Sequence, residues 1–117
     1  MKFALGEIRG MKDPLVNLID KQIPIKTAWK LNRLVKSLDK ELGEIEEFRV
    51  GLVKKFGEEG DDGNFSVPKD KMELFIDEFN ELLNTEIDVE FEPIDIEVFG
   101  DINISAKDLM LLEKIIK

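Results

Sequence analysis

Apolar residues recur every three or four positions between residues 26 and 56, which is the spacing of one face of a long helix. Only Arg49 interrupts this heptad seam, and Leu34, Phe48 and Val53 widen it, as expected for a helix buried within a domain. A helix of this length spans about 45 Å at 1.5 Å per residue, so part of it must project or pair. The seam consists of Ala28, Leu31, Val35, Leu38, Leu42, Ile45, Leu52 and Phe56.

Two shorter elements are predicted before the long helix. Residues 2–8 alternate loosely between apolar and polar side chains, which indicates a short strand or an extended arm. Asp13 can cap a helix and Pro14 suits the first helical position, so a short helix is predicted from there to about residue 21. Pro24 separates this helix from the long one.

A second helix is predicted to pack against the long one. Gly57 is the expected left-handed cap of the long helix, and residues 57–66 have the composition of an exposed loop. Pro68 opens a further helix whose apolar residues again fall on one face. Residues 26–56 and 68–84 are therefore expected to form an antiparallel helical pair.

The last third of the chain predicts strands followed by a helix. Residues 86–92 alternate strictly between carboxylates and apolar side chains, and after Pro93 the inward set becomes Ile94, Ile96 and Val98. Ser105 and Asp108 have the spacing of a capping box for a final helix. The predicted fold is α+β in a single domain, residues 1–117: a long antiparallel helical pair, a small β-sheet and a C-terminal helix.

Charge restricts the classes of partner. The net charge of −9 disfavours general binding of nucleic acid, which requires many cations against phosphates. Residues 1–56 carry 12 basic and 8 acidic side chains, whereas residues 57–117 carry 5 and 18, so the two halves have opposite signs. No apolar stretch is long enough for a membrane helix, and the absence of cysteine fits a reducing cytoplasm.

The residue types argue against an enzyme. Histidine, cysteine and tyrosine are all absent, which removes the common general base, the thiolate nucleophile and the usual zinc ligands. The loop around Gly63 fails as a calcium loop because Lys69 stands where the bidentate glutamate belongs. We therefore predict no catalytic residue, no cofactor and no metal. An acidic strand face is expected to be solvated or to meet a partner: Glu86, Asp88, Glu90 and Glu92.

A basic stripe beside the only tryptophan is the most suggestive feature. Its five cations recur every three or four residues along one helical face, opposite the seam: Lys26, Lys30, Arg33, Lys36 and Lys40. Trp29 lies beside them and could stack a base while the cations hold phosphates. The alternatives are a solvated helix back, or docking onto the acidic strand of a neighbouring subunit.

Several segments together resemble an uncharacterised family of small proteins encoded by tailed bacteriophages. The resemblance spans nearly the whole chain and rests on residues 5–8, 23–26, 62–64, 79–83 and 104–109, which read LGEI, IPIK, DGN, FNELL and ISAKDL. It implies a phage origin and action in the bacterial host cytoplasm or in the virion. It implies no activity.

The expected function is that of a non-enzymatic binding protein. The long seam offers more apolar surface than one short helix can cover, so we predict a homo-oligomer that binds a host or phage protein. The alternatives are an anti-defence protein that sequesters a nucleotide signal through Trp29, Lys30 and Arg33, or a component of the virion or of its assembly.

Overall fold

The computed structural model describes all residues 1–117 and has the predicted α+β architecture. Four α-helices carry most of the chain, and two pairs of very short antiparallel strands and one 3₁₀ helix complete it. The elements in order are β1 (Lys2–Ala4), α1 (Leu5–Ile19), α2 (Ile25–Phe56), β2 (Glu58–Glu59), β3 (Phe65–Ser66), α3 (Lys69–Leu83), β4 (Glu86–Asp88), η1 (Ile96–Phe99) and α4 (Ala106–Leu111).

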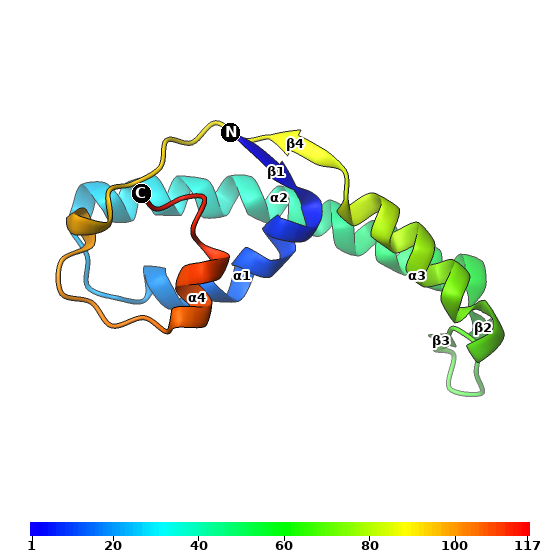
Figure 1. Ribbon diagram of the computed structural model, residues 1–117. Helices are drawn as coiled ribbons and strands as arrows, with labels where there is room; N and C mark the ends of the chain where they lie inside the picture. Colours follow the sequence, from blue (N-terminus) through cyan, green and yellow to red (C-terminus); the bar gives the residue numbers. More distant parts are fainter.

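The 32-residue helix α2 organises the molecule into two parts (Figure 1). Its first half packs with α1, and together with β1, β4 and residues 89–117 these form what we call the body. Its second half packs with α3 and the β2–β3 hairpin in what we call the arm. The radius of gyration is 17.4 Å, whereas a compact chain of this length has about 13 Å. The long helix was expected to project or to pair in part, and its second half pairs with α3 in the arm.

The seam of α2 is buried where it meets its neighbours. Leu31 and Leu38 are buried in the body, and Ile45 and Leu52 continue the buried row toward the arm. The other four seam residues are partly buried. Phe48, which flanks the seam, is instead 47% exposed. The heptad pattern thus identified the face of α2 that packs in the protomer.

Helix α1 begins much earlier than the sequence indicates. The predicted start at Asp13 is wrong, because the helix runs from Leu5 and contains Pro14 in its interior. Buried apolar residues recur every three or four positions through the proline: Leu5, Ile8, Met11, Leu15 and Leu18. Burying this face outweighs the cost of about 3 kcal/mol for an internal proline.

The connection between α2 and α3 is a small hairpin. Gly57 has φ −89° and ψ 167°, so the predicted left-handed cap is wrong and the chain leaves α2 in an extended conformation. Glu58–Glu59 then pairs with Phe65–Ser66, and the turn between them includes Gly63 at φ 81°. All four strand residues are exposed, which agrees with the exposure predicted for residues 57–66.

The predicted strands after α3 are only partly present. Glu86–Asp88 pairs antiparallel with β1, with Phe3 opposite Ile87, but residues 94–98 form no strand. Ile94 makes a single parallel bridge to Ile116, and residues 96–99 turn into a 3₁₀ helix that buries Phe99. The predicted inward set is wrong for Ile96 and Val98, which are exposed: residues 96–99 form a 3₁₀ turn, so the alternation of a strand does not apply to them.

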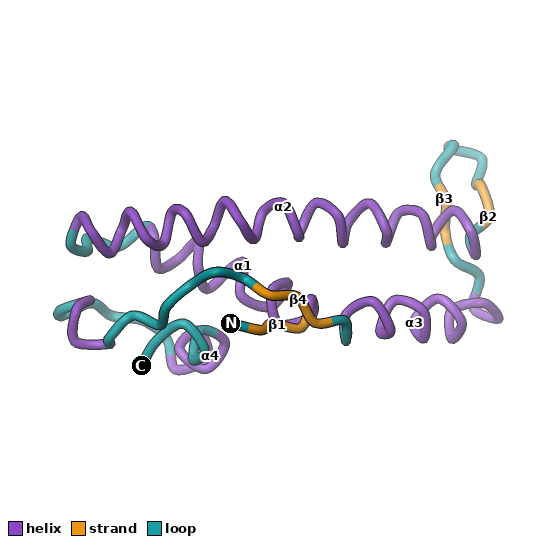
Figure 2. Tube along the Cα trace, turned by 90° about the horizontal axis from the view of Figure 1, so that it is seen from above, coloured by secondary structure: helices purple, strands orange, loops and turns teal.

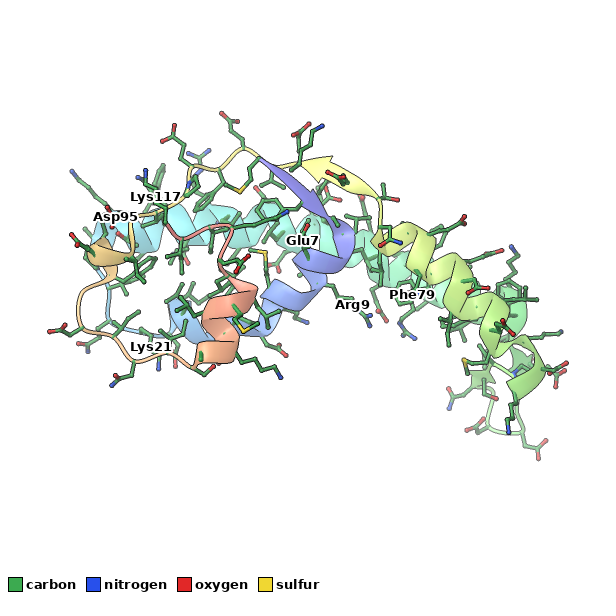
Figure 3. All side chains as sticks on the ribbon, viewed as in Figure 1. Glu7, Arg9, Lys21, Phe79, Asp95 and Lys117 are labelled. Atoms are coloured by element: carbon green, nitrogen blue, oxygen red, sulfur yellow. The ribbon has the colours of Figure 1, made fainter.

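The C-terminal segment closes the body. The amide of Asp108 donates to Ser105 Oγ at 3.0 Å, as the capping box predicts, while the Asp108 carboxylate accepts from Asn17 Nδ2 at 3.1 Å. Lys114 Nζ donates to Glu7 Oε1 at 2.8 Å, and together with the Ala4 amide it lowers the pKa of Glu7. Figure 3 shows Glu7 at the start of α1, in the middle of the molecule.

Candidate interaction surface around Trp29

The first turns of α2 present large apolar side chains to solvent. Ile25 is 84% exposed and Trp29, one turn further along, is 59% exposed. Thr27 and Leu31 point the other way and are buried. Exposed tryptophan is unusual on a monomer and common at the centre of protein interfaces. This end of α2 is therefore the strongest candidate for a binding surface.

An arginine holds the indole from one side. Arg33 lies four residues after Trp29 on the same face of α2, and its Cζ atom is 4.9 Å from the centroid of the Trp29 ring. This is cation–π distance and limits the motion of both side chains. The pair forms a preordered flat surface whose free indole face remains available.

A groove of about 600 Å³ runs beside this pair. One wall comes from α2 and the other from the extended chain just after β4, which lie side by side along the body (Figure 1). The lining residues are Met1, Trp29, Lys30, Arg33, Leu34, Ser37, Glu90, Phe91 and Glu92. The groove combines an aromatic side chain, an apolar floor and charges of both signs.

Backbone hydrogen bonds hold the second wall in place. The Met1 nitrogen donates to the Val89 carbonyl at 3.1 Å, and the Val89 amide donates back to the Met1 carbonyl at 2.8 Å. Val89 is buried, so Glu90 and Glu92 on either side of Phe91 extend outward from an anchored segment. The chain after the short β1–β4 pair therefore brings Glu90 and Glu92 to the groove that Lys30 and Arg33 also line.

The basic stripe remains unpaired along its whole length. The three ion pairs of the protomer join Arg49 to Glu46, Lys55 to Glu78 and Lys114 to Glu7, and none involves a stripe residue. All five stripe cations are exposed. Lys30 and Arg33 line the groove, Lys26 lies with Ile25 in a smaller hollow, and Lys36 and Lys40 continue along α2.

The acidic strand face is divided by the structure. Glu90 and Glu92 line the Trp29 groove, whereas Glu86 and Asp88 lie on β4 and do not line it. The alternation predicted one strand carrying all four residues, and this is wrong: β4 ends at Asp88, and backbone pairing with the N-terminus extends no further than Met1 and Val89. Nowhere do three or more acidic side chains converge to hold a metal ion.

The sequence reasoning missed five residues of this surface: Met1, Ile25, Leu34, Ser37 and Phe91. Leu34 was predicted to widen the apolar seam, and Ser37 lies one turn after Arg33 on the same helix. Ile25 could have been found from its spacing, one turn before Trp29 on the same face. Met1 and Phe91 join the groove only through the β1–β4 pairing, so periodicity gave no signal for them. What the surface offers chemically is stacking, apolar contact and hydrogen bonding to charged groups.

No protein-family model, curated protein or solved structure matches the chain. None of the helices combines the length and the apolar composition that a membrane crossing requires.

Proposed function

We propose that the chain is a non-enzymatic protein-binding protein that acts as a homo-oligomer and uses the Trp29 surface of α2 as its interface. The observation that carries this proposal is the preordered Trp29–Arg33 pair, set among exposed Ile25 and unpaired cations. Tryptophan and arginine are the residue types most enriched among interface hot spots. A partner that covers them gains apolar burial and ion pairs at once.

The groove charges favour a protein over a nucleotide. Lys30 and Arg33 could hold a phosphate, but Glu90 and Glu92 line the same groove. The two carboxylates repel a phosphate held there and so offset part of its attraction to the two cations. A polypeptide, which presents both signs of charge, is a better complement to such a surface.

Position-specific photocrosslinking tests the proposal. A photoreactive phenylalanine analogue replaces Trp29 in bacterial cells that express the chain, and a control variant carries it at Met110, which is 72% exposed on α4. We expect protein adducts at position 29 and not at position 110. Illumination that yields no protein adduct at position 29 overturns the proposal, and a nucleotide adduct there supports signal sequestration instead.

The cellular setting follows from the phage resemblance and is part of the proposal. A protein of this kind acts on a host or phage protein in the bacterial cytoplasm or during virion assembly. The masses of the adducts distinguish these partners, because a self-adduct has about twice the 13.5 kDa mass of the chain whereas other partners give other masses.

A further inference from the structure

Helix α2 carries a second regular pattern on its solvent side. Seven exposed residues follow one another at spacings of four, three, four, four, three and four positions, which places them on one line along the helix. We call this line the outer stripe. It consists of Trp29, Arg33, Lys36, Lys40, Glu44, Glu47 and Gly51.

The outer stripe is self-complementary about Lys40. Lys36 lies four positions before Lys40 and Glu44 lies four positions after it. Arg33 lies seven positions before Lys40 and Glu47 lies seven positions after it, again with opposite charges. At eleven positions the large side chain of Trp29 corresponds to Gly51, which has none.

We propose that α2 pairs with α2 of a second copy in an antiparallel, twofold-symmetric dimer centred on Lys40. A twofold interface brings residue i against residue j and residue j against residue i. Arg33 then faces Glu47 and Lys36 faces Glu44, each pair occurring twice. Trp29 faces Gly51, where no atom lies within 4 Å of the position of a Cβ. The inference rests on the proposed function and names its partner.

The protomer leaves this face free. Figure 2 shows α2 as one layer with α1, α4, β1, β4 and α3 all on one side of it, and only the β2–β3 hairpin extends to the opposite side, at the C-terminal end of α2. No outer-stripe residue takes part in an ion pair or a side-chain hydrogen bond within the protomer. Arg33 shares its groove with Glu90 and Glu92 but forms no ion pair with them, so none of the outer-stripe charges is paired before a second copy arrives.

Charge selects the antiparallel direction. Parallel pairing would place Arg33 against Arg33 and Glu47 against Glu47, which is repulsive along the whole line. Antiparallel pairing leaves only Lys40 beside its own copy. The contact from residue 29 to 51 extends about 33 Å along one helix, which is a small interface and predicts a weak, concentration-dependent dimer.

Cysteine cross-linking tests the register, because the chain contains no cysteine of its own. Two helices packed 8–10 Å apart bring facing Cα atoms within about 6 Å, which a disulfide can bridge. Lys40→Cys should therefore form a covalent dimer under mild oxidation. Lys26→Cys should not, because antiparallel pairing separates the two copies of residue 26 by about 42 Å.

Charge reversal tests the pairing itself. Arg33→Glu and Glu47→Arg should each weaken the dimer about 25-fold in sedimentation velocity, since an exposed ion pair is worth up to about fivefold and each occurs twice. Mixing the two variants restores both pairs, so the heterodimer should regain the original affinity. Lys107→Glu and Glu113→Arg, on exposed positions in and after α4, serve as charge-matched controls without effect.

The outcomes separate the two proposals. A monomer up to about 1 mM, equal cross-linking at positions 26 and 40, or a mixture no tighter than its components overturns the antiparallel dimer. Adducts of position 29 with a different protein, combined with any of these, leave the proposed binding function standing. If position 29 yields no protein adduct, Trp29 is not in an interface, even if Lys40→Cys cross-links. That result overturns both the place of Trp29 in the dimer and the proposed function.

Discussion

Leu31 and Trp29 lie two residues apart on α2, and their replacement by alanine is expected to lower stability by very different amounts. Leu31 is fully buried, so Leu31→Ala removes three buried carbons, worth about 0.8 kcal/mol each, and adds the cost of a cavity. The expected loss of unfolding free energy is about 3 kcal/mol. Trp29→Ala removes a largely exposed ring and one cation–π contact with Arg33, and should cost under about 1 kcal/mol.

Urea denaturation followed by far-ultraviolet circular dichroism measures both losses without using the tryptophan as the probe. In thermal denaturation the same losses correspond to a Tm decrease of about 12 °C for Leu31→Ala and under about 4 °C for Trp29→Ala, at an unfolding entropy of about 2.1 cal/mol/K per residue. The measurement is made at low protein concentration, so that self-association contributes little. Equal losses, or a larger loss for Trp29→Ala, would refute the assignment of one face to packing and the other to binding.

Three further predictions concern local features of the fold. Ser105→Ala removes the cap bond to the Asp108 amide and should lower stability by about 1 kcal/mol in the same assay, whereas Ser105→Asp should restore most of it. Gly43→Ala should raise the free energy of unfolding by about 1 kcal/mol, because nothing lies within 4 Å of the new Cβ. Gly6→Ala should raise it less, since the new Cβ would lie 3.3 Å from the Leu83 carbonyl oxygen. The pKa of Glu7 is lowered in the folded state, so the ionised Glu7 side chain stabilises the fold above its ordinary pKa of 4.5, and this stabilisation is lost as pH falls through the folded pKa. Glu7→Gln should therefore make the decrease of Tm with falling acidic pH less steep. An unchanged slope of Tm against pH would contradict this.

Long periodic segments could be predicted from the sequence because their side-chain spacing reflects a single packed face. The seam of α2 and the apolar face of the second helix of the pair are of this kind, and both helices are present near their predicted bounds. The first half of helix α1 was missed because Asp13 and Pro14 are a strong local start signal, so the helix was predicted to begin there. The burial of Leu5, Ile8 and Met11 stabilises the helix upstream of Pro14 and outweighs the local preference of proline for a helix start. This burial depends on the tertiary structure.

The candidate surface divides in the same way. Trp29 and the basic stripe were found from helical spacing alone, since residues one turn apart share a face. The opposite wall with Phe91 could not be found, because it depends on pairing between residues 86 apart in sequence, such as Lys2 and Asp88. The alternation of side chains around Pro93 predicted a second strand. Ile94 instead forms one isolated parallel bridge with Ile116, so no strand is formed there.

The sharing of α2 between the arm and the body sets an order for folding during synthesis. The arm joins segments that are close in sequence, so α2 and α3 can pair as soon as α3 has left the ribosome. The body waits, because Phe3 and Glu7 find their partners only when Ile87 and Lys114 have been made. Helix α1 can pack on the first half of α2 early, but the face of α1 toward α4 stays uncovered until residues 106–111 have been made, so this face of the nascent chain remains accessible to chaperones.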